Sequence, residues 1–421
     1  MIARRLSNQL SNYLEAKMSN KVPQIRFNGY SDNWVQRKLG DLVDSYNEIV
    51  SGKSNYPVAT SSRRGLFLQS DYFDGARSGI DENVDFHKVP EKYITYRHMS
   101  DDSIFKFNQN DFDTPVLVSK EYPVFRSNQQ ANQKFLLDHL NNSPEFLKFS
   151  ILQKLGGTRV RLYFKNLQAY KLMMPNIEEQ NAIASFFTTV DNLIDANQRK
   201  LDLLKEQKKG YLQKMFPKNG AKVPELRFAG FADDWEERKL QEVLRERNNQ
   251  QPQSMEYPLV SFTVENGVTP KTDRYEREQL VVGDKSSKKY KVTVLNDIVY
   301  NPANLKFGAI SRNKYGNAVF SPIYITFLVN NDVTTPEFIE MFVTRNDFIK
   351  RALKYQQGTV YERQSVSPTD LLAMNVYLPG KSEQEKIGSF FQQLDETIAL
   401  HQRKLDLLTE QKKGYLQKMF V

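Results

Sequence analysis

Two stretches of the chain place apolar residues at alternating spacings of four and three, the pattern of a helix that buries one face in a coiled coil. The first stretch covers residues 178–215 and would form a helix of 38 residues, roughly 57 Å long. The second stretch follows the same grid about two hundred residues further along. The apolar residues of the predicted seam are Ile183, Phe187, Val190, Ile194, Leu201, Leu204, Ile387, Phe391, Leu394, Ile398, Leu405 and Leu408.

A helix of this length cannot cover its own apolar stripe, so we expect the two helices to pack against each other. A full globular segment separates them in the sequence, which lets them run antiparallel and predicts a pseudo-twofold arrangement. The polar seam residues Asn197 and His401 would set the register at some cost in stability. Gly210 and Gly414 each lower helix propensity by about 1 kcal/mol relative to alanine and would permit a bend or close packing.

The chain is internally duplicated. Residues 198–216 and 402–420 are identical at 18 of 19 positions, at an offset of 204. A second repeated block, at an offset of 201, pairs residues 22–39 with 223–240 and aligns Trp34 with Trp235. An internal repeat of about 200 residues indicates that the fold itself is duplicated, so each motif has to be interpreted within one of the two copies. Each half therefore contains the same two framing blocks around its own insert.

The two inserts, residues 41–174 and 242–378, show little resemblance to each other. Both mix short β-rich runs with a few helices, so we predict an α+β fold for each. The expected strands are 93–96, 115–118, 297–301 and 318–328, and the expected helices are 143–154 and 335–354. The predicted organisation is an N-terminal extension (1–21), a first globular domain (22–175), spacer helix 1 (176–216), a linker (217–222), a second globular domain (223–379) and spacer helix 2 (380–421).

Composition indicates a globular protein in the cytoplasm. The 421 residues are 39% hydrophobic and 26% charged, and they include no cysteine, which excludes disulfides, thiolate zinc sites and iron–sulfur clusters. No run of about 18 apolar residues and no signal-peptide pattern is present, so we expect neither export nor a membrane span. The net charge is +9, and the repeated segments 198–216 and 402–420 carry +4 and +3 of it. A polyanionic partner is plausible, and the inserts would have to bind it through local patches.

Catalytic motifs are absent from the sequence. There is no phosphate-binding GxxxxGK[ST] loop, no dinucleotide-binding GxGxxG and no Pro-Asp pair to begin a nuclease site. The histidines lack metal-ligand spacing. Residues 301–304, Asn-Pro-Ala-Asn, resemble the base-holding loop of amino-methyltransferases but lack its second proline and its aromatic residue, so we predict a turn there. We therefore expect no enzymatic activity, no metal and no cofactor.

The repeated blocks closely resemble the specificity subunit of type I restriction-modification systems. The resemblance covers about residues 18–421 and rests on the opening block through Trp34 or Trp235, the Glu-Gln pair that enters each long helix, and the repeated helix ending in Lys-Met-Phe. It implies that each insert is a target recognition domain that reads one half of a bipartite, asymmetric double-stranded DNA sequence. It also implies that the helices set the spacing, and that two methyltransferase subunits and two restriction/translocase subunits assemble on a subunit that does no chemistry.

Basic and polar residues in turn-rich parts of the inserts are the candidate DNA contacts. Arginine and lysine pair with guanine, and asparagine and glutamine with adenine, whereas many other contacts hold phosphates. The candidates are Arg63, Arg64, Lys120, Arg126, Gln129, Arg159, Arg161, Lys285, Lys288, Lys289, Lys306, Arg312, Tyr361 and Arg363. Two rival functions remain open at this point: a coiled-coil adaptor that binds only proteins, and a stand-alone methyltransferase.

Overall fold

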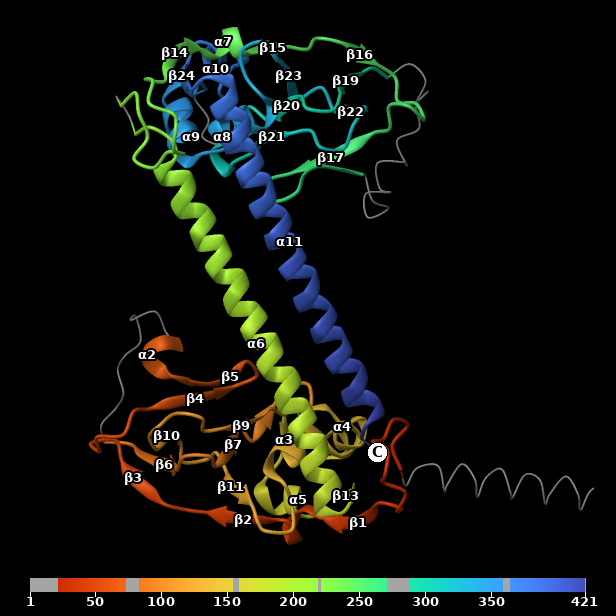
Figure 1. Ribbon diagram of the computed structural model, residues 1–421. Coiled ribbons are helices and arrows are strands. Elements are labelled where there is room, and N and C mark those ends of the chain that lie inside the picture. The colour runs from red at the N-terminus through yellow and green to blue at the C-terminus, as the bar shows by residue number, and fades with distance from the viewer. Residues whose placement is uncertain are drawn as a thin grey trace, which may run out of the picture. The chain divides into compact units, whose positions relative to one another are not determined.

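The computed structural model describes residues 22–72, 83–153, 159–218, 221–270, 288–358 and 364–420. The chain divides into two compact units. Unit 1 combines the first part of the chain, as far as Gln198, with the segment from Lys404 onward, and unit 2 is Arg199–Arg403. The two long helices, α6 (Ile177–Lys214) and α11 (Lys381–Lys418), each contribute one part to each unit. Figure 1 shows these helices and the sheets of each unit.

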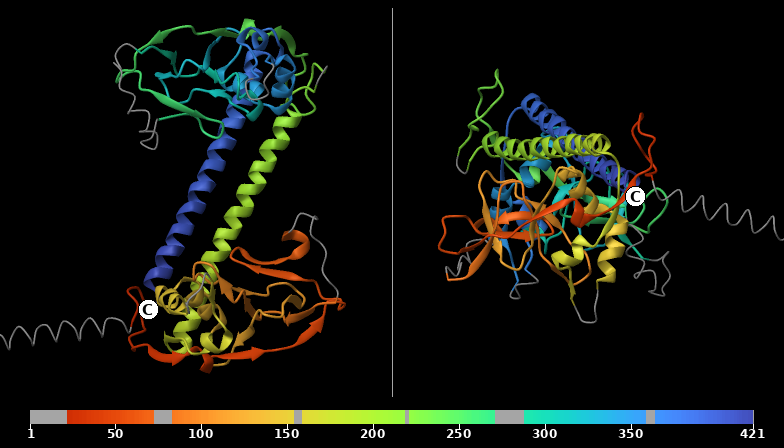
Figure 2. Two further views of the ribbon diagram at one scale, coloured as in Figure 1. Left: turned by 180° about the vertical axis from the view of Figure 1, so that it is seen from behind. Right: turned by 90° about the horizontal axis from the view of Figure 1, so that it is seen from below.

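Unit 1 contains a four-stranded antiparallel sheet in the order β2-β11-β7-β9 and a three-stranded sheet in the order β10-β6-β3. Its helices α3, α4 and α5 gather around the start of α6, while β3, β6 and β10 extend away from that helix (Figures 1 and 2). The elements are β1 (Val35–Lys38), η2 (Leu39–Asp41), β2 (Val43–Tyr46), β3 (Ile49–Ser51), β4 (Ala59–Ser62), β5 (Gly65–Leu68), α2 (Gln69–Tyr72), β6 (Asp85–Val89), β7 (Ile94–Tyr96), β8 (Met99–Ser100), β9 (Phe107–Gln109), β10 (Val116–Ser119), β11 (Val124–Ser127), α3 (Gln133–Asn142), α4 (Pro144–Leu152), β12 (Val160–Arg161), α5 (Phe164–Gln168) and β13 (Lys171–Met174).

Unit 2 has the same strand arrangement. Its four-stranded sheet runs β15-β23-β20-β21, its three-stranded sheet runs β16-β19-β22, and the hairpin β17-β18 corresponds to β4-β5. The elements are β14 (Glu236–Lys239), α7 (Leu240–Val243), β15 (Leu244–Glu246), β16 (Gln250–Gln251), β17 (Val260–Thr263), β18 (Gly267–Pro270), β19 (Tyr290–Thr293), β20 (Ile298–Tyr300), η4 (Leu305–Phe307), β21 (Ile310–Arg312), β22 (Ala318–Phe320), β23 (Ile325–Val329), α8 (Pro336–Val343), α9 (Asn346–Ala352), η5 (Leu353–Tyr355), α10 (Pro368–Leu372) and β24 (Asn375–Leu378).

Local sequence explains where several of these elements begin. Ser143 and Thr335 cap α4 and α8 by accepting hydrogen bonds from backbone N–H groups of the first turn, and a proline follows each cap. The central strands β7 and β20 are buried along their whole length, as expected for strands covered on both faces. Each ends at a tyrosine whose hydroxyl donates to a backbone carbonyl, Tyr96 to Leu162 and Tyr300 to Val366.

Two of the expected elements are wrong in extent. The strand expected over 318–328 is two strands in different sheets, because a turn closed by the bond from Tyr324 N–H to the Ser321 carbonyl interrupts it. The helix expected over 335–354 is α8, α9 and the short η5, because the chain leaves helical geometry at Arg345. The pattern of apolar residues continues across both breaks, so it does not distinguish two successive strands or helices from one long element.

Within each unit, the start of one long helix lies beside the end of the other. In unit 1 the rings of Phe186 and Tyr415 meet edge to face with centroids 5.2 Å apart, and Asp191 pairs with Lys412. Since the residue numbers rise along α6 as they fall along α11, the two segments are antiparallel there. The equivalent contacts recur in unit 2, where the Tyr211 and Phe390 rings lie 5.1 Å apart and Lys208 pairs with Asp395 at 2.5 Å.

The predicted seam residues differ in burial along the helices. Ile183, Phe187, Leu201, Leu204, Ile387, Phe391 and Leu405 are buried, whereas Val190, Ile194, Leu394, Ile398 and Leu408 are half-buried. Asn197 is buried and donates to the Leu193 carbonyl of its own helix. A Cβ added at Gly210 or Gly414 would meet no atom within 4 Å, so these glycines are not sites of close packing.

Each core is completed by the end of a long helix. Leu416, Met419 and Phe420 belong to the core of unit 1, and the Phe420 ring lies 5.2 Å from that of Phe135. Met215 and Phe216 occupy the matching place in unit 2. The ring centroids of Phe216 and Phe338 lie 5.4 Å apart. The repeated Lys-Met-Phe sequence is therefore a docking segment for the core as well as a helix end.

Candidate nucleic-acid interface

Three of the predicted arginines of unit 1 converge on β8 and the loop that follows it. Arg63 lies in the turn between β4 and β5, and Arg161 lies in β12, which pairs with β8. Arg63 forms an ion pair with Asp102, and Arg159 Nε lies 2.9 Å from Asp101 Oδ1. The side chains of Arg63 and Arg159 are 56% and 57% exposed, so both remain accessible while they are held.

Asp101 and Asp102 orient the arginines of this cluster and leave several of their N–H donors available. The hydrogen bond from Arg63 is the largest of the effects that lower the pKa of Asp102, to about 2, so this partner stays ionised at neutral pH. A guanidinium has five N–H donors in a planar fork, and one carboxylate contact leaves several of them open to solvent. An exposed group of oriented guanidiniums suits phosphate oxygens or the O6 and N7 acceptors of guanine.

Arg97 joins the same cluster and was missed at the sequence level. It is exposed and directly follows the buried strand β7. Burial lowers the pKa of His98, and the charges of Arg161 and Arg97 lower it further; the ring of His98 stacks on that of Tyr163 with centroids 5.7 Å apart. The exposed β10–β11 connection with Lys120 lies at this end of the sheet, because Val124 at the start of β11 pairs with Thr95 of β7. An arginine directly after a predicted β-rich strand was the available signal.

Two of the remaining candidates of unit 1, Arg126 and Gln129, lie apart from this cluster. Arg126 lies 3.9 Å from Asp44 and its guanidinium carbon is 5.4 Å from the centroid of the Tyr93 ring, at the opposite end of β7. Gln129 is exposed in the loop before α3. Arg64, in the β4–β5 turn, has its guanidinium carbon 5.8 Å from the Phe67 ring centroid. A three-residue strand spans roughly 10 Å, so Arg126 and Gln129 would contact a different part of a ligand.

In unit 2, two of the described candidates, Lys288 and Lys306, lie beside aromatic rings. Lys288 and Lys289 are exposed just before β19, and Lys288 Nζ lies 5.4 Å from the Tyr290 ring centroid. Lys306 in η4 places its Nζ 5.1 Å from the Phe307 ring centroid. The candidates Lys285, Tyr361 and Arg363 lie outside the described residues.

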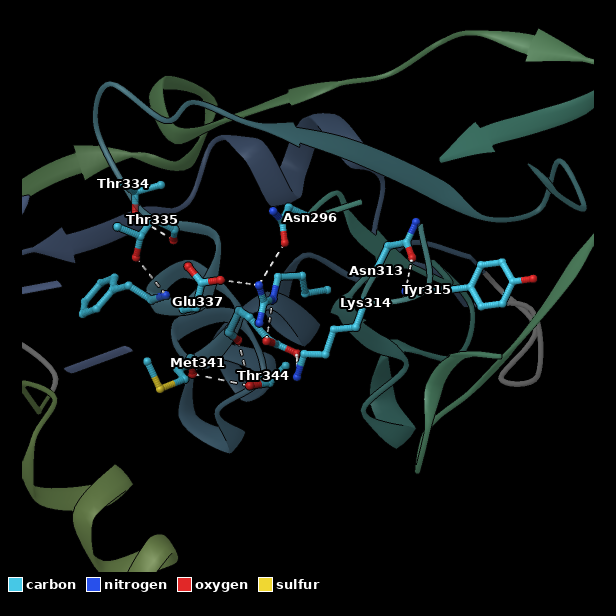
Figure 3. A network of polar contacts seen from close by, with 12 residues as sticks. Asn296, Asn313, Lys314, Tyr315, Thr334, Thr335, Glu337, Met341 and Thr344 are labelled. Carbon is cyan, nitrogen blue, oxygen red and sulfur yellow. Dashed lines mark hydrogen bonds and ion pairs between the residues drawn. The ribbon is translucent and has the colours of Figure 1, made fainter. Parts of the chain in front are cut away.

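Arg312 differs from the other candidates because its side chain is only 13% exposed. It forms an ion pair with Glu337, places Nε 3.0 Å from Glu340 Oε2 and donates to Asn296 Oδ1 at 2.9 Å. Asn296 and Glu337 both point toward this network, and Lys314 extends from its edge (Figure 3). A guanidinium engaged in this way links β21 to α8, so we leave Arg312 out of the proposed DNA-contacting set.

The Asn-Pro-Ala-Asn segment is a turn, as its sequence predicts. Asn301 Oδ1 accepts hydrogen bonds from the backbone N–H groups of Ala303 and Asn304, at 3.1 and 3.3 Å. Across the parts of the chain that the structure describes, no group of three or more His, Asp or Glu side chains could hold a metal ion. No described helix is long and apolar enough to cross a membrane.

The sequence model of a family described as the type I restriction modification DNA specificity domain matches the chain twice, at residues 31–206 and 232–410. A curated relative from Methanocaldococcus jannaschii, a putative type I restriction enzyme MjaX specificity subunit, is 21% identical over 413 residues, 91% of each protein. The MjaVIII specificity subunit from the same organism is 24% identical over 252 residues, 56% of this chain and 54% of that protein. The solved S subunit of a type I restriction-modification system from M. genitalium aligns with a TM-score of 0.57 at 13% identity, covering 95% of this chain and 99% of that one. These matches confirm the predicted α+β fold class and the resemblance carried by the repeated motifs.

Proposed function

We propose, because this chain belongs to the type I restriction-modification DNA specificity family, that each of its units reads one half of a bipartite, asymmetric target in double-stranded DNA. The family supports a role in DNA sequence specificity. In the proposal, the chain itself is not catalytic, works in the cytoplasm and carries two methyltransferase subunits. Two restriction/translocase subunits join in the full complex.

One observation carries the proposal: the two units present different side chains at equivalent places of the same framework. The hairpin turn beside the central sheet holds Arg63 and Arg64 in unit 1 but Val264, Glu265 and Asn266 in unit 2. The residue after the tyrosine that ends the central strand is Arg97 in unit 1 and Asn301 in unit 2. Arginine and asparagine suit different base edges, so a shared scaffold with dissimilar loops fits two dissimilar half-sites.

Exchange of one insert tests this proposal. We would replace residues 41–174 by the insert of another specificity subunit, express the chain with its methyltransferase, and read the methylated motif by sequencing the host genome. We expect one half of the motif to change and the other half to stay. A change in both halves, or in neither, would contradict modular readout.

The adaptor alternative makes a different prediction for binding. Phosphate contacts make affinity for duplex DNA fall steeply as salt rises, whereas an adaptor without DNA readout shows no such binding. Gel shifts of the chain with its methyltransferase over a range of salt concentrations separate the two. Binding of S-adenosylmethionine by the isolated chain would instead favour the stand-alone methyltransferase.

A further inference from the structure

A pocket of about 210 Å³ opens in unit 2 between the β17–β18 hairpin and the segment that follows β20. Pockets for drug-sized ligands have volumes of about 300–1,000 Å³, so this one suits a single flat ring system. Three aromatic rings, two asparagines and two small apolar side chains line it. The lining residues are Phe262, Val264, Asn301, Asn304, Phe307, Ala309 and Tyr324.

Asn301 supplies the pocket with a hydrogen-bond donor. The residue is only 6% exposed, and its side-chain oxygen already accepts two backbone N–H groups. Its amide nitrogen donates to no other group in the described part of the chain, although the residue lines the pocket. Because the turn holds this side chain in one orientation, its amide nitrogen is a positioned donor for a ligand that brings an acceptor.

The aromatic residues supply flat walls. The rings of Phe262 and Tyr324 lie 5.8 Å apart on one side. Phe307 is 64% exposed, an unusual position for a large apolar side chain, and the ammonium group of Lys306 lies beside its ring. In a duplex the faces of the bases are covered by their neighbours, so these apolar rings would contact a base edge while the ammonium group of Lys306 would contact a nearby phosphate.

In unit 1 a charged contact joins the equivalent hairpin turn to the segment after the central strand. There the hairpin turn reaches the segment after the central strand through Arg63, whose guanidinium pairs with Asp102 and lies 3.5 Å from Ser100 Oγ. The hairpin turn of unit 2, Val264-Glu265-Asn266, contains no arginine or lysine to form such a pair. The pocket therefore belongs to the part of the framework where the two units differ.

We propose that this pocket receives the edge of one nucleobase that presents hydrogen-bond acceptors, and that Asn301 donates to it. This inference rests on the proposed function. In the major groove guanine offers O6 and N7, thymine offers O4 and adenine offers N7, whereas cytosine presents only an amino group, which needs an acceptor. Because the oxygen of Asn301 is occupied by the turn, the side chain cannot accept from an amino group. An apolar protein side chain would leave the amide nitrogen without a partner.

The substitution Asn301→Asp tests the donor directly. Aspartate has nearly the same shape and keeps the oxygen that the turn requires, but it replaces the donor with an acceptor. In the complex with the methyltransferase, we expect at least tenfold weaker binding to the original target, since one base contact carries this much discrimination. We also expect one position in the half-site of unit 2 to lose its discrimination against cytosine. Asn317→Asp, an exposed substitution outside the pocket, controls for the added charge.

A second variant keeps the proposal falsifiable if Asn301→Asp destabilises the turn. Phe307→Ala removes an exposed ring, so the fold is expected to persist while binding to the target weakens and the other half-site stays unchanged. An unchanged motif and affinity in folded Asn301→Asp, or in Phe307→Ala, overturns the pocket proposal. If exchange of the unit 2 insert still alters one half-site in that case, the proposed function stands. If that exchange alters nothing, the proposed function itself fails.

Discussion

Arg26 and Glu179 form a two-pronged ion pair, with Arg26 Nε 2.6 Å from Oε1 and Nη2 2.7 Å from Oε2 of the carboxylate. The pair joins the first repeated block to the start of α6, and Glu179 is almost completely enclosed, at 1% side-chain exposure. Arg227 and Glu383 repeat it in unit 2 at 2.7 Å for both contacts. The duplicated Arg and Glu therefore fasten each long helix to its own unit.

Removal of one partner of this pair is expected to destabilise the unit strongly. Arg26→Met leaves a buried carboxylate without its cation, and loss of one partner from a buried pair costs about 3–5 kcal/mol. Urea unfolding followed by far-UV circular dichroism measures the change. Lys148→Met breaks the exposed pair with Glu145 and should cost less than about 1 kcal/mol. Equal effects of the two substitutions would show that the enclosed pair has no special role.

The buried seam positions of the long helices predict a second effect. Leu201→Asp places a charge at a position that is 1% exposed, and we expect the free energy of unfolding to fall by roughly 3 kcal/mol or more. Leu405→Asp, at the repeated position, should act similarly in unit 1. The matched controls Leu203→Asp and Leu407→Asp change residues that are 52% and 55% exposed, and their effects should stay within about 0.5 kcal/mol. Thermal unfolding of the four variants checks this, and a stable Leu201→Asp with normal methyltransferase assembly would refute the coiled-coil seam.

Unit 1 should lose stability in acid through His139. This side chain is fully buried, its Nε2 lies 2.8 Å from the Tyr170 hydroxyl, and its Nδ1 has no partner. Burial lowers the pKa of His139 from 6.5 to about 3, so the unfolded state binds a proton more readily than the folded state. The stabilisation is complete above pH 6.5 and is lost as the pH falls toward 3, by roughly 1.4 kcal/mol per pH unit.

Unit 2 has a phenylalanine at the position of His139, which suggests a substitution that would remove the acid sensitivity of unit 1. Phe135 and Phe338 pack on Trp34 and Trp235, and four residues beyond them stand His139 and Phe342 respectively. We expect His139→Phe to flatten the dependence of the free energy of unfolding on pH between 6.5 and 3. The difference between the two urea-unfolding curves at each pH isolates this residue. Identical slopes for the two proteins would mean that other groups govern acid sensitivity.

Duplex binding should weaken when Arg161 is neutralised. Arg161→Gln keeps an exposed polar side chain in β12 but removes a charge from the convergent arginine cluster. We expect the free energy of binding to weaken by about 1–3 kcal/mol. If the contact is to phosphate, the slope of log K against the logarithm of the salt concentration should also become shallower by about one. Fluorescence anisotropy at several salt concentrations, with the methyltransferase present, measures both quantities. Lys148→Gln, on α4, should change neither; an Arg161 variant that behaves like it would remove this residue from the interface.

Long regular features were predictable from the sequence, whereas features that depend on tertiary neighbours were not. The long helix expected over 178–215 is α6, within one residue at each end, because about five heptads of regular pattern leave little ambiguity. Arg312 resembled a DNA contact because the sequence does not show that β21 packs against Glu337 and Glu340 of α8. Arg97 was missed because the sequence does not show that β12 pairs with β8, which brings Arg161 close to Arg97 in the candidate interface.

The docking of Phe420 into the core of unit 1 affects the order in which the protein can fold during synthesis. The sheets of unit 1 leave the ribosome early, but the aromatic ring that packs against Phe135 and Phe187 is made only after the strands of unit 2. At translation rates of about 5–20 residues per second, that wait lasts on the order of ten seconds or more. Unit 2 has no such delay, because Phe216 precedes its strands in the chain. The unit that is translated first is therefore the one that completes its core last.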